Sequence, residues 1–473
     1  MANITHGAQS SKAPTSVSSP NVAATGIAFA VGATPVHTVD GKVNEVIMLN
    51  NWEEAVTALG YSDDWKNYGL SEVIYTMFKL YKVSPVFVVN VLDPAKHKKT
   101  GTTTATPVDN QIKLPISTID TSVKITGKKV DEDFAVFYDD ENCIVEFLKD
   151  NATETTVTYD EVDPSAVTKN DIIGGFSTST HKHTGLDLID SVYPKYTYAP
   201  DLILCPNWSH DPEVAAVMAA KGENINEVFA ADAILDVDTA EAGYYTEVPA
   251  WKKSKNFSRT NELVCFPHVA LGEKIFNYSS QLAGLMAQVD NTDEYGGGTP
   301  CESASNKTLQ ADSAVLADGT EVIMDLQGAN YLNDNGVITA LNFAGSFTSW
   351  GNYTAAFPTS TDPVDYFYCI SRMFKWVGKT VVQSYWSKLD RKLTRRLIDA
   401  ILEGVNTWLR GLTADEKILG GRVELREEEN TLTALMAGRA KFHISLTPPS
   451  PLQKLDFVLE YDVSYLQTSL LAE

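Results

Sequence analysis

Apolar residues recur every three or four positions between Asp365 and Arg410, close to the C-terminus of the chain. The second half of this stretch carries one apolar stripe along a predicted helix of about six turns. The stripe consists of Leu389, Leu393, Leu397, Ile401, Val405 and Trp408. Because such a stripe is stable only when it is buried, we expect this helix to pack against another surface.

The first part of the chain predicts the order strand, helix, helix, strand. GIAFAVGAT and EVIMLN are strand-sized apolar runs. Residues 51–59 predict a helix with Asn50 or Asn51 as N-cap and Gly60 as its end, and residues 70–81 predict a second helix. VFVVNVL is a continuous apolar run, typical of a strand covered on both faces. This order indicates an α/β domain.

The pattern changes after residue 94. Short alternating segments such as SVKITG, CIVEFL and TTVTYD indicate a small all-β insert. The α/β pattern returns at Asp201: DLILCPNW and FAADAILDVD predict strands that flank a helix opened by Asp211 and Pro212, and ELVCFPHVAL predicts another strand before a helix at 279–289. Asn335-Gly336 is a turn signal between the runs ANYLND and VITALNF.

The sequence predicts an extended arm at each end of the chain. Residues 1–25 are rich in Ser, Ala, Thr, Asn and Pro and contain too few large apolar residues to pack alone. Near the other end, LDFVLEYDVSYL alternates apolar residues with the polar residues Asp456, Glu460, Asp462 and Ser464, after a half-buried strand in AKFHISLTP. Its apolar positions are Leu455, Phe457, Leu459, Tyr461, Val463 and Tyr465. Such a terminal strand either completes its own sheet or pairs with a sheet edge of another copy.

These patterns divide the chain into six parts. We expect an N-terminal arm at 1–25, the first part of an α/β domain at 26–93, a mostly β insert facing outward at 94–200, the second part of the α/β domain at 201–345, a domain at 346–454 that contains the amphipathic helix, and a C-terminal arm at 455–473.

The composition is that of a folded protein, with 44% hydrophobic and 21% charged residues and a formal net charge of −23. This acidity argues against binding to nucleic acid or to an anionic membrane. The one basic cluster lies on the amphipathic helix and predicts an acidic partner. It consists of Lys388, Arg391, Lys392, Arg395 and Arg396.

No apolar run could span a bilayer and no signal peptide is recognisable, so we expect assembly in the cytoplasm. The five scattered cysteines predict buried free thiols.

Three places invite a chemical interpretation. His181 and His183 lack further metal ligands nearby, so a solvated loop is the simpler interpretation. The carboxylates Asp232, Asp236 and Asp238 follow a strand without a phosphate-binding loop, and the glycine-rich segment 291–308 matches no nucleotide motif. No nucleophile, base and orienting group come together. We therefore predict no catalytic residues, no metal and no cofactor, and keep as the alternative an α/β enzyme with a site near Asp232–Asp238 or the glycine loop.

The order of several motifs resembles that of contractile tail sheath proteins, which occur in phages, phage-tail-like bacteriocins and related contractile injection systems. The motifs are His6-Gly7 with a later AVGAT, NNWEEAVTALG before VFVVNVL, SSQLAGLMAQVDNTDEYGGGTP, YLNDNGVITALNFAGSFTSWGNYT, and DRKLTRRLIDAILEGVNTWLRGL. They cover both ends and most of the α/β part but not the insert. Where the family often has Trp-Gly-x-Arg-Thr, this chain has Trp350-Gly351-Asn352-Tyr353-Thr354 and lacks the arginine.

The resemblance implies a multidomain sheath fold with mixed sheets, a structural rather than enzymatic role, and a helical polymer around an inner tube. It implies that the basic helix touches an acidic outer face of the tube, and that both arms add strands to the sheets of neighbouring copies. Baseplate and tail terminator proteins are the further partners implied, in a virion tail or a phage-tail-like particle. A tail tube or baseplate protein is disfavoured by the length of the chain and by the basic helix.

Overall fold

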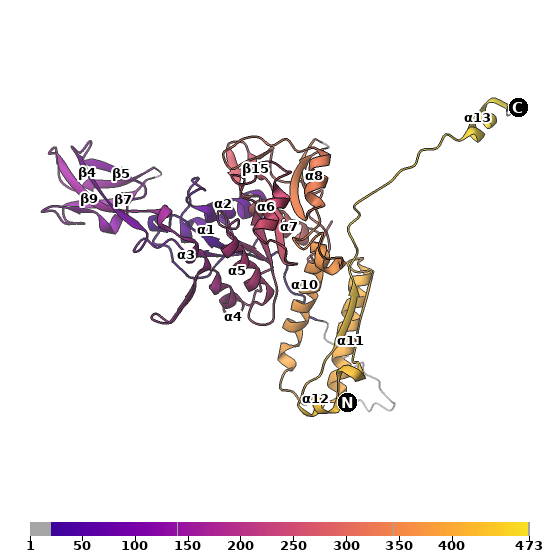
Figure 1. Ribbon diagram of the computed structural model, residues 1–473. Helices are drawn as coiled ribbons and strands as arrows, with labels where there is room; N and C mark the ends of the chain where they lie inside the picture. Colours follow the sequence, from indigo (N-terminus) through magenta and orange to yellow (C-terminus); the bar gives the residue numbers. More distant parts are fainter. Residues whose placement is uncertain (1–19, 140, 344, 472–473) are drawn as a thin grey trace, which may run out of the picture.

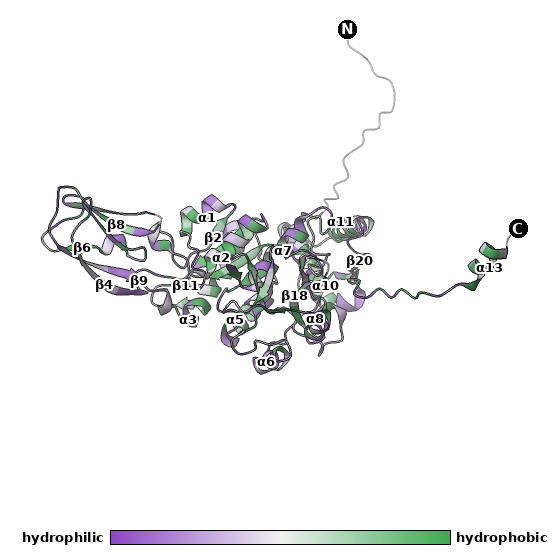
Figure 2. Cartoon of the chain, turned by 90° about the horizontal axis from the view of Figure 1, so that it is seen from above, coloured by the Kyte–Doolittle hydropathy of each residue, from purple (hydrophilic) through white to green (hydrophobic). Residues whose placement is uncertain are grey.

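The computed structural model describes residues 20–139, 141–343 and 345–471. A β-rich insert lies at one end, an α/β body in the middle, and two long helices at the other end, from which the C-terminal segment extends into solvent (Figure 1). Seen from above, the insert and the C-terminal segment leave the body in opposite directions (Figure 2). Residues 1–19 of the predicted N-terminal arm lie outside the described residues.

The body is built on an eight-stranded sheet in the order β19-β18-β14-β13-β12-β1-β3-β2. Its six inner strands are parallel. They are β1 (Ala28–Gly32), β3 (Val86–Asn90), β12 (Leu202–Leu204), β13 (Asp232–Asp236), β14 (Glu262–Cys265) and β18 (Val337–Asn342). The edge strands β2 (Ile47–Leu49) and β19 (Phe347–Trp350) are antiparallel to their neighbours. The predicted α/β class is confirmed.

Helices cover both faces of this sheet, as expected for parallel strands buried on two sides. In β1, Phe29 and Val31 belong to one core, whereas Ala28 and Ala30 belong to the other. The first core is completed by α4 (Val192–Tyr196), α5 (Pro212–Glu223), α6 (Val248–Ser254) and α8 (Leu326–Asn333). The second core is completed by α1 (Trp52–Leu59), α2 (Gly69–Tyr75) with its π-helical continuation Thr76–Leu80, and α7 (Tyr278–Asn291).

The local signals that end helices are confirmed where a side chain makes the cap. Asn51 caps α1 by accepting a hydrogen bond from the Glu54 backbone N–H at 2.9 Å, and Gly60 ends that helix with a φ of 70°. Asp211 caps α5 in the same way.

Two predicted runs turned out differently. ANYLND is not a strand but lies in α8, which Asp325 caps. ELVCFPHVAL is interrupted at Pro267 and forms β14 and the separate β15 (His268–Leu271), because proline cannot donate to the strand ladder. Strand β15 pairs with β16 (Lys274–Phe276) and β17 (Ser313–Val315) in a small antiparallel sheet.

The insert consists of two three-stranded antiparallel sheets with their own apolar core. Its strands are β4 (Lys98–Ala105), β5 (Gln111–Pro115), β6 (Lys124–Ile125), β7 (Phe134–Tyr138), β8 (Asn142–Phe147) and β9 (Thr155–Val162). Residues after β9 contribute to the core of the body instead, through α3 (Lys169–Ile173) and a 3-10 helix at Gly185–Ser191. Between them lies the hairpin of β10 (Gly175–Ser177) and β11 (Lys182–Thr184).

The C-terminal part is organised by two long helices, α10 (Tyr368–Tyr385), which follows the short α9 (Pro363–Tyr366), and α11 (Arg395–Ala414). Trp376 of α10 packs against Trp408 of α11 with ring centroids 5.5 Å apart. A hairpin of β20 (Gly420–Glu424) and β21 (His443–Thr447) packs against α11, and α12 (Leu432–Met436) lies in its loop. Among the described helices, none has the length and hydropathy needed to cross a bilayer.

Candidate functional site

Helix α10 is fastened to the body by three buried ion pairs. Its basic residues at positions i, i+3 and i+7 meet carboxylates from three segments of the body. Arg372 pairs with Asp290 near the end of α7, Lys375 with Asp232 at the start of β13, and Lys379 with Asp201 just before β12. The Arg372 guanidinium is bidentate on Asp290, at 2.9 and 2.5 Å. Such desolvated pairs hold a fixed geometry, because removing either partner leaves a buried charge unpaired.

A second stripe of α10 holds the described start of the chain, residues 20–25. The Trp376 indole N–H donates to the Ala23 carbonyl at 2.9 Å, and the Ala23 N–H donates to Thr380 Oγ1 at 3.2 Å. One turn further, Ser384 Oγ accepts from the Asn21 N–H at 2.8 Å. This stripe therefore fixes residues 21–23 against α10.

The predicted basic residues lie at the far end of the two long helices, in the connection that we call the tip (residues 386–396). Lys388 ends a 3-10 turn, Arg391 and Lys392 lie in the following non-helical segment, and Arg395 and Arg396 form the first turn of α11. Among the described residues, only Arg395 of these five is in an ion pair, with Asp399 at 2.9 Å. The other four charges remain available to a partner.

The predicted start of the amphipathic helix, at Leu389, is wrong, because α11 begins at Arg395. Thr394 caps α11 by accepting from the Leu397 N–H, and Asp390 has a φ of 59°, which breaks the helix before the cap. Leu389 and Leu393 therefore do not belong to the buried stripe and are exposed. The basic cluster is confined to a turn, a connecting segment and one helical turn instead of lying along one helix.

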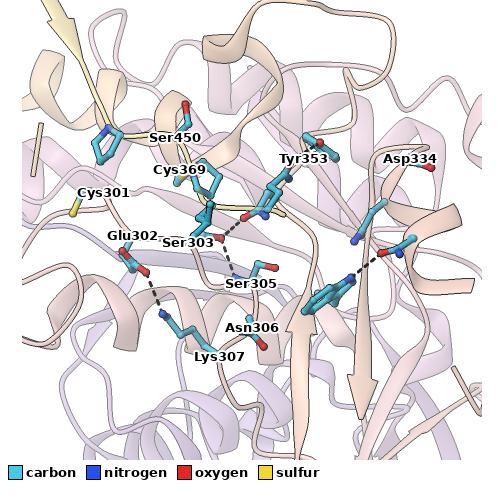
Figure 3. A pocket seen from close by; sticks show the side chains of 18 residues that line it. Cys301, Glu302, Ser303, Ser305, Asn306, Lys307, Asp334, Tyr353, Cys369 and Ser450 are labelled. Atoms are coloured by element: carbon cyan, nitrogen blue, oxygen red, sulfur yellow. Dashed lines mark hydrogen bonds and ion pairs between the residues drawn. The ribbon is translucent and has the colours of Figure 1, made fainter. Parts of the chain in front are cut away.

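The C-terminal segment leaves the body beside a polar cleft of about 500 Å³ (Figure 3). Tyr353 stacks on Phe357, with ring centroids 3.9 Å apart, and its hydroxyl donates to Gln453 Oε1 at 2.8 Å. Three prolines, Pro448, Pro449 and Pro451, stiffen the chain just before this contact. Tyr353 stands in the motif that lacks the family's arginine, and here it anchors the departing chain.

Beyond this anchor the predicted strand residues extend into solvent. Leu455, Phe457, Leu459 and Tyr461 lie in an exposed, irregular stretch, whereas Val463 and Tyr465 begin α13 (Val463–Leu471). The nearest small sheet of the chain, β20 and β21, is two-stranded, and in the part of the chain that the structure describes neither strand has a second partner. The described part of the chain thus contains both an arm that lies outside its sheets and a two-stranded sheet with open edges.

The residues of the enzyme alternative have structural roles. Asp232 neutralises Lys375, and Asp236 accepts hydrogen bonds from Ser209 Oγ, the Ser279 N–H and Ser279 Oγ. In the glycine-rich segment, the Gly297 carbonyl accepts from Lys417 Nζ at 2.7 Å. His183 pairs with Asp187. Within residues 20–139, 141–343 and 345–471, no three His, Cys, Asp or Glu side chains are grouped to hold a metal ion.

Sequence reasoning missed the three ion pairs of Arg372, Lys375 and Lys379, which we call the α10 clamp, and the residues of α10 that hold the described start of the chain. The spacing of Arg372, Lys375 and Lys379 was a usable signal, since three basic residues on one helical face need partners. Their carboxylates come from three remote segments, however, so the sequence did not identify the pairs.

Comparison with known proteins gives a match along the whole chain. It is 26% identical over 492 residues to the tail sheath protein of Burkholderia phage BcepMu, covering 99% of this chain and 98% of that protein. This similarity over the whole length supports the predicted resemblance to contractile tail sheath proteins. The tail sheath protein of Escherichia phage P2 is 28% identical over 222 residues, covering 44% of this chain and 52% of that protein. No protein-family model matches the sequence.

Solved structures support the same sheath fold. The helical sheath of the anti-feeding prophage in its contracted state aligns with a TM-score of 0.59, at 11% identity, covering 96% of this chain and 99% of that chain. The sheath complex of an extracellular contractile injection system in its contracted state gives 0.58 at 10% identity, covering 98% and 100%. At these identities the likeness shows the fold, which confirms the predicted multidomain sheath architecture.

Proposed function

We propose that this chain is a structural subunit of a contractile tail sheath, which polymerises helically around an inner tube and contracts to drive the tube through a target cell envelope. The observation that carries this proposal is the end-to-end match to a tail sheath protein, 99% of one chain against 98% of the other. The sheath fold, shared with chains in contracted assemblies, supports it.

Copies of the chain would be joined by their arms. The alternating residues from Leu455 to Tyr465 would add a strand to a free edge of the β20–β21 hairpin of a neighbour, as would the N-terminal arm. A two-stranded sheet is marginal alone, and a further strand satisfies its open N–H and C=O groups. Since main-chain pairing depends little on the side chains, such joints would keep copies connected while the polymer changes its pitch and radius.

The tip would face the inner tube. Lys388, Arg391, Lys392, Arg395 and Arg396 suit an acidic outer face of that tube. Each exposed ion pair contributes about 0–1 kcal/mol, so these contacts can break together when the sheath contracts.

The energy of contraction would be stored during assembly without nucleotide. Baseplate and tail terminator proteins would bind the ends of the polymer, in a virion tail or phage-tail-like particle assembled in the bacterial cytoplasm. We propose no role for nucleic acid, cofactor or membrane anchor.

Negative-stain electron microscopy of the purified chain tests this proposal. We expect hollow tubes from the full chain and none after removal of residues 455–473. A sharper variant is Val458→Pro with Leu459→Pro, which removes adjacent N–H donors that point to opposite sides of the arm. The matched control, Val458→Ile with Leu459→Ile, keeps strand propensity and should still form tubes. Small uniform particles that are unchanged by truncation would refute the strand-adding role and favour an enzyme.

A further inference from the structure

The tip exposes large apolar side chains among its positive charges. Trp386 is 61% exposed, Leu389 59% and Leu393 41%. All three lie in the connection between α10 and α11, within a stretch of eight residues. A tryptophan exposed to this extent loses the burial that normally stabilises its ring, so a second surface is expected to cover it.

A neighbouring loop adds to this apolar surface. Helix α12, in the loop of the β20–β21 hairpin, lies at the same lower end of the molecule in Figure 1. Its Leu432 is 75% exposed and its Met436 is 81% exposed. The end of the C-terminal part therefore presents apolar side chains from two separate loops.

The fold itself does not require this exposure. Leu389 and Leu393 continue the apolar period of α11 toward the N-terminus, yet Thr394 caps the helix and Asp390 has a left-handed conformation, so that α11 begins only after both leucines. In the part of the chain that the structure describes, the Trp386 ring has no aromatic neighbour, unlike Trp376 and Trp408 in the core just above. These residues are thus presented to solvent by a specific local structure.

We propose that the tip binds its partner through a mixed surface, in which Trp386 is the apolar anchor, flanked by Leu389 and Leu393, and the basic residues set orientation and approach. This rests on the proposed function: the partner is the outer face of the inner tube, which must offer an apolar depression bordered by carboxylates. The positive tip of a chain with net charge −23 requires an acidic partner. The surfaces proposed to join copies are the arms and hairpin, which leaves the tip for the tube.

The two kinds of contact make different contributions. An exposed ion pair changes an affinity by no more than about fivefold and weakens with salt. A desolvated tryptophan at the centre of an interface is commonly worth at least about 30-fold, and burial of its ring does not depend on screening. Salt should therefore weaken tube binding only in part, leaving an apolar remainder.

Co-sedimentation of the full-length chain with preformed tubes of the tail tube protein from the same particle tests this inference, between 0.1 and about 1 M NaCl. We expect Trp386→Ala to weaken binding at least about tenfold at every salt concentration, and Trp386→Phe to recover part of the loss. Lys392→Ser with Arg396→Ser should weaken binding at low salt and flatten its salt dependence. Phe343→Ala removes an exposed aromatic residue of the body and is the matched control.

Each outcome separates the inference from the proposed function. If Trp386→Ala binds tubes like the unchanged chain while the basic variants do not, the apolar anchor is refuted and the sheath role stands. If Trp386→Ala blocks polymerisation without tubes but leaves tube binding intact, the tip joins copies and the inference is overturned. If the unchanged chain neither binds tubes nor polymerises, the proposed function itself fails.

Discussion

At the scale of single residues, the body contains a carboxyl group in an unusual environment. Glu72 of α2 is fully buried and accepts hydrogen bonds from the Asn277 N–H at 2.9 Å and the Asn277 side-chain amide at 2.7 Å. Burial raises the pKa of Glu72 to about 8, and the hydrogen bonds from Asn277 offset only part of this effect. The group is therefore protonated in the folded chain at neutral pH.

This carboxyl makes stability depend on pH in a defined direction. Its pKa is about 8 in the folded state, above the ordinary value of 4.5 in the unfolded state, so its contribution is complete below pH 4.5 and is lost as the pH rises toward 8. We expect the free energy of unfolding to fall over this window, by at most about 1.4 kcal/mol per pH unit from this group. Above pH 8 its effect should level off.

Replacement by an uncharged analogue isolates this contribution. Glu72→Gln should have a shallower pH dependence than the unchanged chain in urea unfolding at pH 5, 6.5 and 8. The exposed Glu53→Gln serves as control and should leave the slope unchanged. Equal slopes for all three proteins would show that Glu72 ionises with an ordinary pKa in the folded state.

At the scale of elements, helix α10 determines how the C-terminal part sits on the body. Arg372→Met removes one member of a buried bidentate pair and leaves Asp290 charged and unpaired. We expect it to lower the free energy of unfolding by about 3–5 kcal/mol. Thermal or urea unfolding of the purified chain measures this loss.

A double substitution separates the charge from the packing. Arg372→Met with Asp290→Leu removes both charges and should recover most of the loss, since apolar residues of similar volume replace buried pairs at little cost. Lys129→Met breaks the exposed pair with Glu132 and should change stability by no more than about 1 kcal/mol. A double variant as unstable as Arg372→Met alone would mean that shape, and not the unpaired charge, causes the destabilisation.

Sequence patterns predicted elements well where local chemistry decides their limits. The caps Asn51 and Asp211 and the terminator Gly60 were predicted and found, because each acts within four residues. The start of α11 was predicted wrongly, because periodicity extends to Leu389 although the cap is made by Thr394. The arm from Leu455 to Tyr465 carries the pattern of a strand, but within the described residues it is paired with none of the sheets. The α10 clamp was missed because its carboxylates are distant in sequence.

At the scale of the whole molecule, the insert is nearly an independent body. It has its own apolar core, and its first and last strands leave the α/β body side by side, with Lys98 paired to Val162 and the Asp163 N–H donating to the His97 carbonyl at 2.9 Å. Its contacts with the body include His37 Nε2, which bonds to the Ile116 carbonyl at 3.0 Å. Close ends allow an insert to be removed without moving the chain around it.

Deletion of this insert is therefore expected to spare the rest of the molecule. When residues 98–162 are replaced by a short Gly-Ser linker, the chain should unfold cooperatively within a few degrees of the full protein and should still form tubes, visibly thinner in negative stain because the insert projects from the body (Figure 1). Deletion of the hairpin 420–447 is the contrasting variant, since it removes the open sheet edges and should abolish tubes. If loss of the insert also prevented tube formation while leaving unfolding unchanged, the insert would have to contact neighbouring copies, and strand pairing by the arms would not be sufficient to hold the polymer.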